Sequence, residues 1–329
     1  MNRFVQRLVV ATLCGVLVYG AFALYTGLEK MRASLAEFAW SSFVVALILA
    51  SANYLVRFLK WQYYLRRLGI RGIAWADSFL VFLSGFVLTV TPGKVGEVFK
   101  SAVLFRTHGV PVERTAPIVV AERLTDAIGV IVLIVLGSAS FAGGRLWAAA
   151  GTAAVAVGLL AILWERPVEL VLGVLENGER GRRLVPKLRE AYRSLRVVAG
   201  PVALVLPTLL SVIAWAAEGF AMWIILSGFR QEIPLPRAVF FYSTSTLAGA
   251  LVPLPGGLGI VEGMIREQLV HLNHVPDGIA TAVMILIRFA TLWWAVAVGF
   301  LALALLRVRY GTKLGSSAEL VTPSESASP

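Results

Sequence analysis

Long apolar runs separated by clusters of charge constrain this chain more than any other feature of its sequence. The hydrocarbon core of a bilayer is roughly 30 Å thick, and a helix needs about 20 apolar residues to cross it. Runs of about that length lie at 4–26, 38–59, 117–140, 146–164, 202–228 and 279–306. The chain is 58% hydrophobic and 15% charged, whereas soluble domains average about 25% charged residues. We therefore expect an all-α polytopic membrane protein with six transmembrane helices.

Two further apolar segments, 77–107 and 237–270, are each interrupted by proline and glycine. The interruptions read TPGKVGE at 91–97 and VPLPGGLGIVEG at 252–263. Proline removes a backbone donor and glycine destabilises a helix interior, so each segment is predicted to form two half-helices. Because broken backbone at membrane depth must be buried in protein or line a wet cavity, we expect two re-entrant broken-helix hairpins.

The distribution of basic residues favours hairpins that return to the side from which they enter. In that arrangement 22 Lys and Arg residues fall on the cytoplasmic side, five of them in 57–72, and 6 fall outside, as the positive-inside rule requires. If each hairpin crossed the membrane, the basic loop 165–200 would lie outside. We therefore expect a multi-pass protein of the inner (cell) membrane with both termini in the cytoplasm. Residues 1–310 would form the membrane domain, with 165–200 as a helical cytoplasmic element, and 311–329 a flexible cytoplasmic tail.

A shift of 165 residues aligns the two halves of the chain around the interruptions. It places Glu97 opposite Glu262 and Arg123 opposite Arg288, with a shared leucine and a shared Val-Pro pair between them. The predicted repeat units, each a span, a hairpin and a second span, are 38–140 and 202–306. With one hairpin entering from each side, the halves form an inverted-topology repeat, in which secondary transporters place their site near the midplane. An old duplication kept only for packing is the alternative.

The interruptions and the charges near them suit an anion. At each interruption the second half-helix presents free N–H groups and the positive end of its dipole. Lys94 adds an ammonium, and the glycines let a ligand approach the backbone. Arg123 and Arg288 cost about 2.5 to 3.5 kcal/mol each inside a span, and their guanidinium forks suit a lipid phosphate. The expected substrate-binding residues are Lys94, Gly96, Glu97, Arg123, Asp126, Gly257, Gly259, Glu262 and Arg288.

Structural alternatives stay open for these charges. Each arginine could pair with the glutamate of its own repeat and tie the hairpin to the neighbouring helix, and such a pair could still open for a substrate. The acids Glu122, Asp126 and Glu218 could carry a coupling proton, because a carboxyl group in a low-dielectric site can titrate near neutrality. Each of them could equally be the partner of a buried arginine.

Enzyme and metal chemistry have no signal in this sequence. Cys14 is the single cysteine and there are three histidines, which leaves no multi-cysteine zinc or iron–sulfur site. The sequence contains no GxSxG, P-loop, dinucleotide-binding or HExxH motif. We therefore expect no enzymatic activity, no metal and no cofactor. Because the net charge of +11 follows from membrane topology, we expect no nucleic-acid partner.

Several motifs together resemble the lysylphosphatidylglycerol synthase transmembrane domain family, also called flippase-like membrane proteins. They are PGKVGEVFK at 92–100, ERLTDAIGV at 122–130, PLPGGLGIVEG at 253–263 and the late-span Arg288. The resemblance covers about residues 5 to 306. It implies movement of an anionic or polyisoprenoid-linked lipid between leaflets. The soluble aminoacyltransferase domain of the synthase members has no counterpart after residue 310, so lysyl transfer is not expected.

We therefore expect a flippase in which two re-entrant hairpins form a central polar cavity for a membrane lipid with an anionic headgroup. The alternative is a non-transporting membrane scaffold or partner of a lipid-modifying enzyme or glycosyltransferase. A third class, a membrane enzyme acting on a lipid phosphate, lacks a recognisable nucleophile or metal cluster. A cavity lined by both interruptions favours transport, and a sealed apolar centre favours the scaffold.

Overall fold

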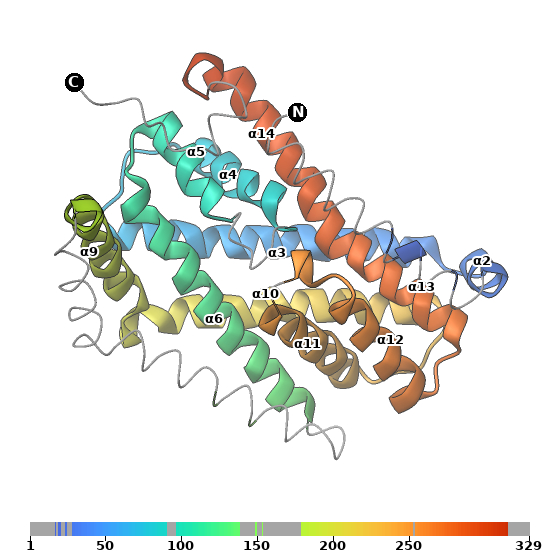
Figure 1. The fold of residues 1–329 in the computed structure, drawn as a ribbon. Helices are drawn as coiled ribbons and strands as arrows, with labels where there is room; N and C mark the ends of the chain where they lie inside the picture. The colour runs from blue at the N-terminus through green and yellow to red at the C-terminus, as the bar shows by residue number, and fades with distance from the viewer. Residues whose placement is uncertain are drawn as a thin grey trace.

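The structure, a computed structural model, describes residues 28–90, 97–138, 179–252 and 254–314, together with Leu17, Tyr19, Gly20, Leu24, Ala149 and Ala153. Every regular element among these residues is helical (Figure 1). The α-helices are α2 (Leu28–Ala36), α3 (Trp40–Arg67), α4 (Trp75–Ser84), α5 (Phe99–His108), α6 (Val112–Ser138), α9 (Glu179–Ala199), α10 (Pro201–Gly228), α11 (Leu235–Leu251), α12 (Ile260–Asn273), α13 (Asp277–Arg288) and α14 (Trp294–Leu314). The expected spans at 4–26 and 146–164 lie almost wholly outside the described residues.

Three of the described helical segments are long and apolar enough to cross a membrane, namely Trp40–Arg67, Val202–Gly228 and Asp277–Gly311. The last joins α13 to α14 through a π-helical turn at Phe289–Trp293. Large apolar side chains are exposed along α3 at Val44, Ile48, Leu55 and Leu59. They are spaced four, seven and four residues apart, which is about one, two and one helical turns. This spacing places them on one face of the helix, as a lipid-facing stripe requires. The all-α membrane architecture predicted from the sequence is therefore present.

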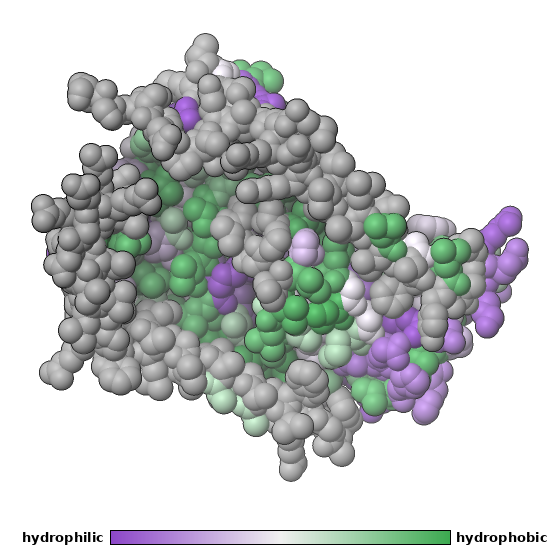
Figure 2. Space-filling view, in the orientation of Figure 1, coloured by the Kyte–Doolittle hydropathy of each residue, from purple (hydrophilic) through white to green (hydrophobic). Residues whose placement is uncertain are grey.

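The surface shows the same division between apolar and polar regions. Among the residues coloured in Figure 2, those in the middle of the visible face are mostly hydrophobic, and hydrophilic ones gather at the right-hand end, around α2 and the adjoining ends of α12 and α13. A small hydrophilic patch lies within the apolar middle. Polar groups gathered at an end and few in the middle are what a lipid bilayer selects.

Helix α3 runs further than the sequence indicated. The apolar run was expected to end near residue 59, with Arg57 and Lys60 counted among the cytoplasmic charges of 57–72. Both instead belong to α3, which continues to Arg67, and the side chain of Lys60 is 1% exposed. Lys100, which was also counted as cytoplasmic, is buried within α5. Charge alone does not end a membrane helix when a neighbouring helix supplies the counter-charge.

The two halves repeat one order of elements, a long helix, a pair of short helices around an interruption, and a second long helix. Helices α3 and α10 are both 28 residues long and lie side by side (Figure 1). The end of α3 meets the start of α10 where Lys60 donates to Ser211. The residue before α3, Ala39, donates its N–H to the last residue of α10, Gly228. The equivalent helices are thus antiparallel, as an inverted repeat requires.

Both interrupted segments consist of two helices rather than one. In the first, α4 continues through a 3₁₀ turn at Gly85–Leu88, and α5 follows residues 91–96, which lie outside the described part. In the second, α11 and α12 pack closely, since a Cβ added at Gly249 would lie 2.3 Å from Val261 Cγ2. Whether each pair re-enters the membrane from one side stays a prediction.

The basic segment 165–200 is helical where it is described. Helix α9 packs across α6 and the start of α10 at one end of the molecule (Figure 1). Its location in the cytoplasm remains a prediction from the charge distribution.

Candidate functional site

A buried ion pair between Glu262 and Arg288 holds the second interruption. Glu262 is fully buried, and its Oε1 accepts from Arg288 Nε at 2.6 Å. Its other oxygen accepts from the backbone N–H of Gly259 at 2.7 Å, so the side chain also caps the start of α12. Arg288 Nη2 donates to the carbonyl of Gly256 at 2.7 Å. One guanidinium therefore fixes both the loop and the helix that follows it.

The glycines of this loop are required by its backbone. Gly256, Gly257 and Gly259 have φ values of 60°, 67° and 87°. Residues with a Cβ rarely adopt this left-handed region. The three glycines turn the chain sharply enough to bring the Gly256 carbonyl and the Gly259 N–H onto the Arg288–Glu262 pair.

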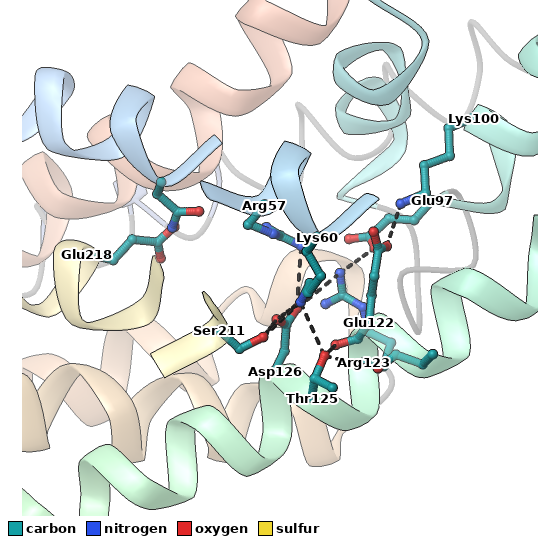
Figure 3. A network of polar contacts seen from close by, with 12 residues as sticks. Arg57, Lys60, Glu97, Lys100, Glu122, Arg123, Thr125, Asp126, Ser211 and Glu218 are labelled. Carbon is teal, nitrogen blue, oxygen red and sulfur yellow. Dashed lines mark hydrogen bonds and ion pairs between the residues drawn. The ribbon is translucent and has the colours of Figure 1, made fainter. Parts of the chain in front are cut away.

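A larger charged cluster occupies the corresponding place in the first half (Figure 3). Arg123 pairs with Glu97, and Lys100 pairs with Glu122. Lys60 Nζ contacts Asp126 Oδ1 at 2.6 Å, and Ser211 of α10 donates to the same oxygen at 2.9 Å. Arg57 Nη2 lies 3.5 Å from Asp126 Oδ2. The cluster consists of Arg57, Lys60, Lys100 and Arg123 with Glu97, Glu122 and Asp126.

Four cations face three carboxylates within this cluster, and a fourth carboxylate, Glu218, stands in the same cavity wall as Arg57. Asp126 is already neutralised at short distance by Lys60, and Arg57 makes the longer contact with it. The Arg57 guanidinium also lies 5.7 Å from the centre of the Phe86 ring, a cation–π contact. Of the four cations, Arg57 makes the longest contact with its nearest carboxylate of the cluster.

A third polar group lies in the middle of the α3–α10 contact. Asn53 Nδ2 donates to Glu218 Oε1 at 2.5 Å, and the Tyr242 hydroxyl of α11 donates to the other oxygen of Glu218. Asn53 is 1% exposed and Glu218 6% exposed. These three side chains join the two central helices to the second interrupted pair.

Each of these groups contributes one or two residues to the wall of a central cavity of about 70 Å³. Its wall includes Tyr54, Arg57, Phe86 and Thr89 from the first half, and Glu218, Tyr242, Gly256, Gly257 and Arg288 from the second. A water molecule needs about 10 to 15 Å³ measured in this way. The cavity therefore holds a few water molecules as it stands, and a larger headgroup requires the surrounding helices to move apart.

The structure divides the predicted site residues into three sets. Arg288 and Gly257 line the cavity, and Glu262 and Gly259 support Arg288 from behind. The residues Glu97, Arg123 and Asp126 belong to the charged cluster and are not among the cavity-lining residues. Lys94 and Gly96 lie outside the described residues.

Sequence reasoning did not identify Arg57 as the cavity-lining cation of the first half, and it missed Lys60 and Tyr242 altogether. One signal for Lys60 was present, because the apolar and aromatic pattern continues past it as WQYYL. Tyr19 was also missed; its hydroxyl accepts from Trp293 Nε1 at 2.8 Å and lies 3.4 Å from Glu262 Oε1. A tyrosine in an apolar segment gives no sequence signal for such a contact.

Comparisons with known proteins agree with this architecture. A family model described as the lysylphosphatidylglycerol synthase TM region matches residues 7–299. A UPF0104 membrane protein of Methanothermobacter thermautotrophicus is 23% identical over 314 residues, covering 88% of this chain and 92% of the relative. A second match to a UPF0104 membrane protein of that organism is 25% identical over 91 residues, covering 28% of this chain and 27% of the relative. The matched region takes in both interruptions and the central cavity.

Proposed function

The chain belongs to the family of the lysylphosphatidylglycerol synthase TM region, and we propose that it moves a lipid with an anionic headgroup between the leaflets of the cell membrane. The family name points to a lipid-related membrane function, and the polar centre of the fold supports the finer statement. In this proposal both interrupted pairs are re-entrant hairpins entering from opposite sides, and both termini are cytoplasmic.

The observation that carries the proposal is that Arg57 and Arg288, one from each half, line the same cavity. Two arginines in the wall of one small space suit a phosphate, which accepts bidentate hydrogen bonds from arginine. Among the cations of its cluster, Arg57 makes the longest contact with its nearest carboxylate. A bound anion would give the Arg57 guanidinium a closer partner.

Binding at these arginines would also act on the interruptions. A phosphate at Arg288 competes with Glu262 and with the Gly256 carbonyl, which are the contacts that hold the second interruption. A phosphate at Arg57 competes with Asp126. Asp126 also lies 3.9 Å from Arg123. Arg123 is in turn the partner of Glu97, at the end of the first interruption. The same event thus weakens the ties at both interruptions, and alternating access requires such ties to open.

The scaffold alternative predicts a sealed apolar centre. The cavity wall instead includes two arginines, a glutamate and two tyrosines beside its apolar residues, and buried charge is costly unless it has a function or a partner. This composition favours a transport site over a purely packing interface.

The proposal is tested by leaflet exchange in proteoliposomes. Purified protein is reconstituted with phosphatidylglycerol labelled on one acyl chain, and dithionite added outside reduces the label of the outer leaflet alone. We expect protein-containing vesicles to lose nearly all fluorescence, and protein-free vesicles about half. Inorganic phosphate is added as a competitor in one arm, and its uptake is measured in another. Exchange no faster than in protein-free vesicles, with this lipid and with a labelled polyprenyl phosphate, overturns the proposal, and uptake of free phosphate would then identify the site as one for the inorganic ion.

A further inference from the structure

Glu218 is a cavity-lining carboxylate to which the proposed headgroup clamp gives no role. It lies in the middle of α10, and both of its oxygens accept hydrogen bonds, from Asn53 and from Tyr242. It also lines the same cavity as Arg57 and Arg288. An acid side chain therefore stands in the wall of a site whose two arginines are suited to an anion.

A bound phosphate and the ionised Glu218 carboxylate would repel each other in so small a cavity. The cavity measures about 70 Å³, and like charges repel strongly where protein replaces water. In the empty cavity the Glu218 carboxylate shares the wall with two arginines and accepts hydrogen bonds from Asn53 and Tyr242. A phosphate that engages both arginines takes up their charge and adds its own negative charge beside the carboxylate.

A proton on Glu218 resolves this conflict. It removes the negative charge, and a protonated carboxyl group gains an O–H donor that a phosphate oxygen accepts. The side chains that set the local field are the titratable and charged groups facing Glu218 from the packed helices. They are Tyr54 and Arg57 of α3, Tyr242 of α11 and Arg288 of α13, with Asp126 of α6 reaching α10 at Ser211, two turns before Glu218.

We propose that Glu218 is a proton-binding site coupled to the anion site, so that one proton accompanies each anionic headgroup through the membrane. This inference rests on the proposed function, because it assigns the energy coupling of the same cavity. Linkage is reciprocal: if the anion favours the protonated carboxyl, then protons favour anion binding. One linked proton changes the affinity by up to about tenfold per pH unit.

Proton uptake on binding tests the coupling directly. The probe is dihexanoyl phosphatidylglycerol, whose phosphodiester keeps a single negative charge near neutrality. It is added to the purified full chain in weakly buffered detergent solution with a pH indicator, and its affinity is measured by calorimetry across that pH range. We expect wild type to take up about one proton per bound probe, with affinity rising up to about tenfold per pH unit as the pH falls.

Variants at Glu218 separate coupling from folding. Glu218→Gln should bind the probe with no proton uptake and with a pH-independent affinity. Glu218→Asp keeps a titratable group and should retain the uptake. Glu232→Gln removes an exposed carboxylate after α10 and should behave as wild type. Thermal unfolding of each variant shows which ones fold.

An imposed pH gradient across the proteoliposomes gives the transport readout. Net movement of labelled phosphatidylglycerol toward the leaflet facing the alkaline side is expected for wild type and not for Glu218→Gln. Lipid exchange that ignores the gradient in wild type, or proton uptake that persists in Glu218→Gln, overturns the coupling and leaves the lipid-moving function standing. Absence of lipid exchange in the protein-containing vesicles instead overturns the proposed function itself.

Discussion

Asn53 and Glu218 hydrogen-bond each other at equivalent positions of the two repeats. A shift of 165 residues brings one onto the other, and Asn53 Nδ2 lies 2.5 Å from Glu218 Oε1. A contact between equivalent positions of antiparallel helices places the axis that relates the halves close to that contact. The inverted repeat inferred from scattered sequence identities thus has a physical centre, and the cavity adjoins it.

Equivalent positions on the two sides of this axis do not all carry the same kind of side chain. Lys60 contacts Ser211 on one side of the Asn53–Glu218 pair. The positions that the shift makes equivalent to them are Ile225 and Ala46, and both are fully buried and apolar. The Lys60–Ser211 contact therefore has no polar counterpart across the axis, whereas the Glu97–Arg123 pair has one in Glu262–Arg288.

We expect Arg288→Lys to impair lipid transport more than it impairs folding. Lysine keeps the charge but loses the fork that reaches Glu262 and the Gly256 carbonyl together. Arg288→Ala leaves Glu262 buried without its cation and should cost about 3 to 5 kcal/mol of unfolding free energy. Thermal unfolding in detergent and lipid exchange in vesicles are measured on both variants. Wild-type exchange by Arg288→Lys would show that the arginine is only a structural tie.

Lys100 and Glu122 should contribute to stability and not to transport. Their pair is buried beside the Trp61 ring, 4.7 Å from Lys100 Nζ, and neither residue lines the cavity. Lys100→Met alone should cost about 3 to 5 kcal/mol, because Glu122 then stays buried and unpaired. Adding Glu122→Leu should restore most of that stability, a coupling that a double-mutant cycle of melting measurements detects. A double variant that is stable but inactive would place the pair in the transport path.

Gly249 should be intolerant of any side chain. A Cβ there meets Val261 Cγ2 at 2.3 Å and would push α11 away from α12. We expect Gly249→Ala to lower the unfolding free energy by about 1 to 3 kcal/mol, as overpacking does. Gly311→Ala is the matched helical control, since nothing lies within 4 Å of its added Cβ. Equal melting temperatures for the two variants would mean that the α11–α12 contact is looser than described.

The expected topology can be checked by labelling single cysteines. In a chain carrying Cys14→Ser, Leu188→Cys on α9 and Glu232→Cys after α10 are both exposed positions. An impermeant maleimide applied to intact cells should label the cysteine at 232 and spare the one at 188. The reverse pattern would contradict both the charge argument and the re-entrant hairpins.

The Glu–Arg pairs illustrate what sequence could predict here. The equal spacing of Glu97 to Arg123 and of Glu262 to Arg288 indicated the two ion pairs, because a tie between an interruption and the next helix needs the same length of chain in both halves. The proline and glycine interruptions likewise predicted paired short helices. Both signals are either local in the sequence or repeated in its two halves, so they can be read from a single sequence.

The cavity cation of the first half could not be found in this way. Asp126 lies 66 residues from Lys60 in the chain, so nothing near Lys60 shows that its charge is neutralised inside the protein. Counting it as cytoplasmic therefore shortened the first long helix and left Arg57 outside the predicted site. Tertiary neutralisation of charge overrides the rule that a charged residue marks the end of a span.

The most direct test of the central claim compares Arg57→Gln with Arg67→Gln in the lipid-exchange assay. Both variants remove one arginine from α3, but Arg57 lines the cavity whereas Arg67 is exposed at the end of the helix. A charge-assisted hydrogen bond contributes about 1.5 to 3 kcal/mol, so Arg57→Gln should slow exchange of labelled phosphatidylglycerol by about ten- to a hundredfold. Arg67→Gln should exchange lipid at the wild-type rate. Equal rates for wild type, Arg57→Gln and Arg67→Gln would contradict the claim that the central cavity binds the headgroup.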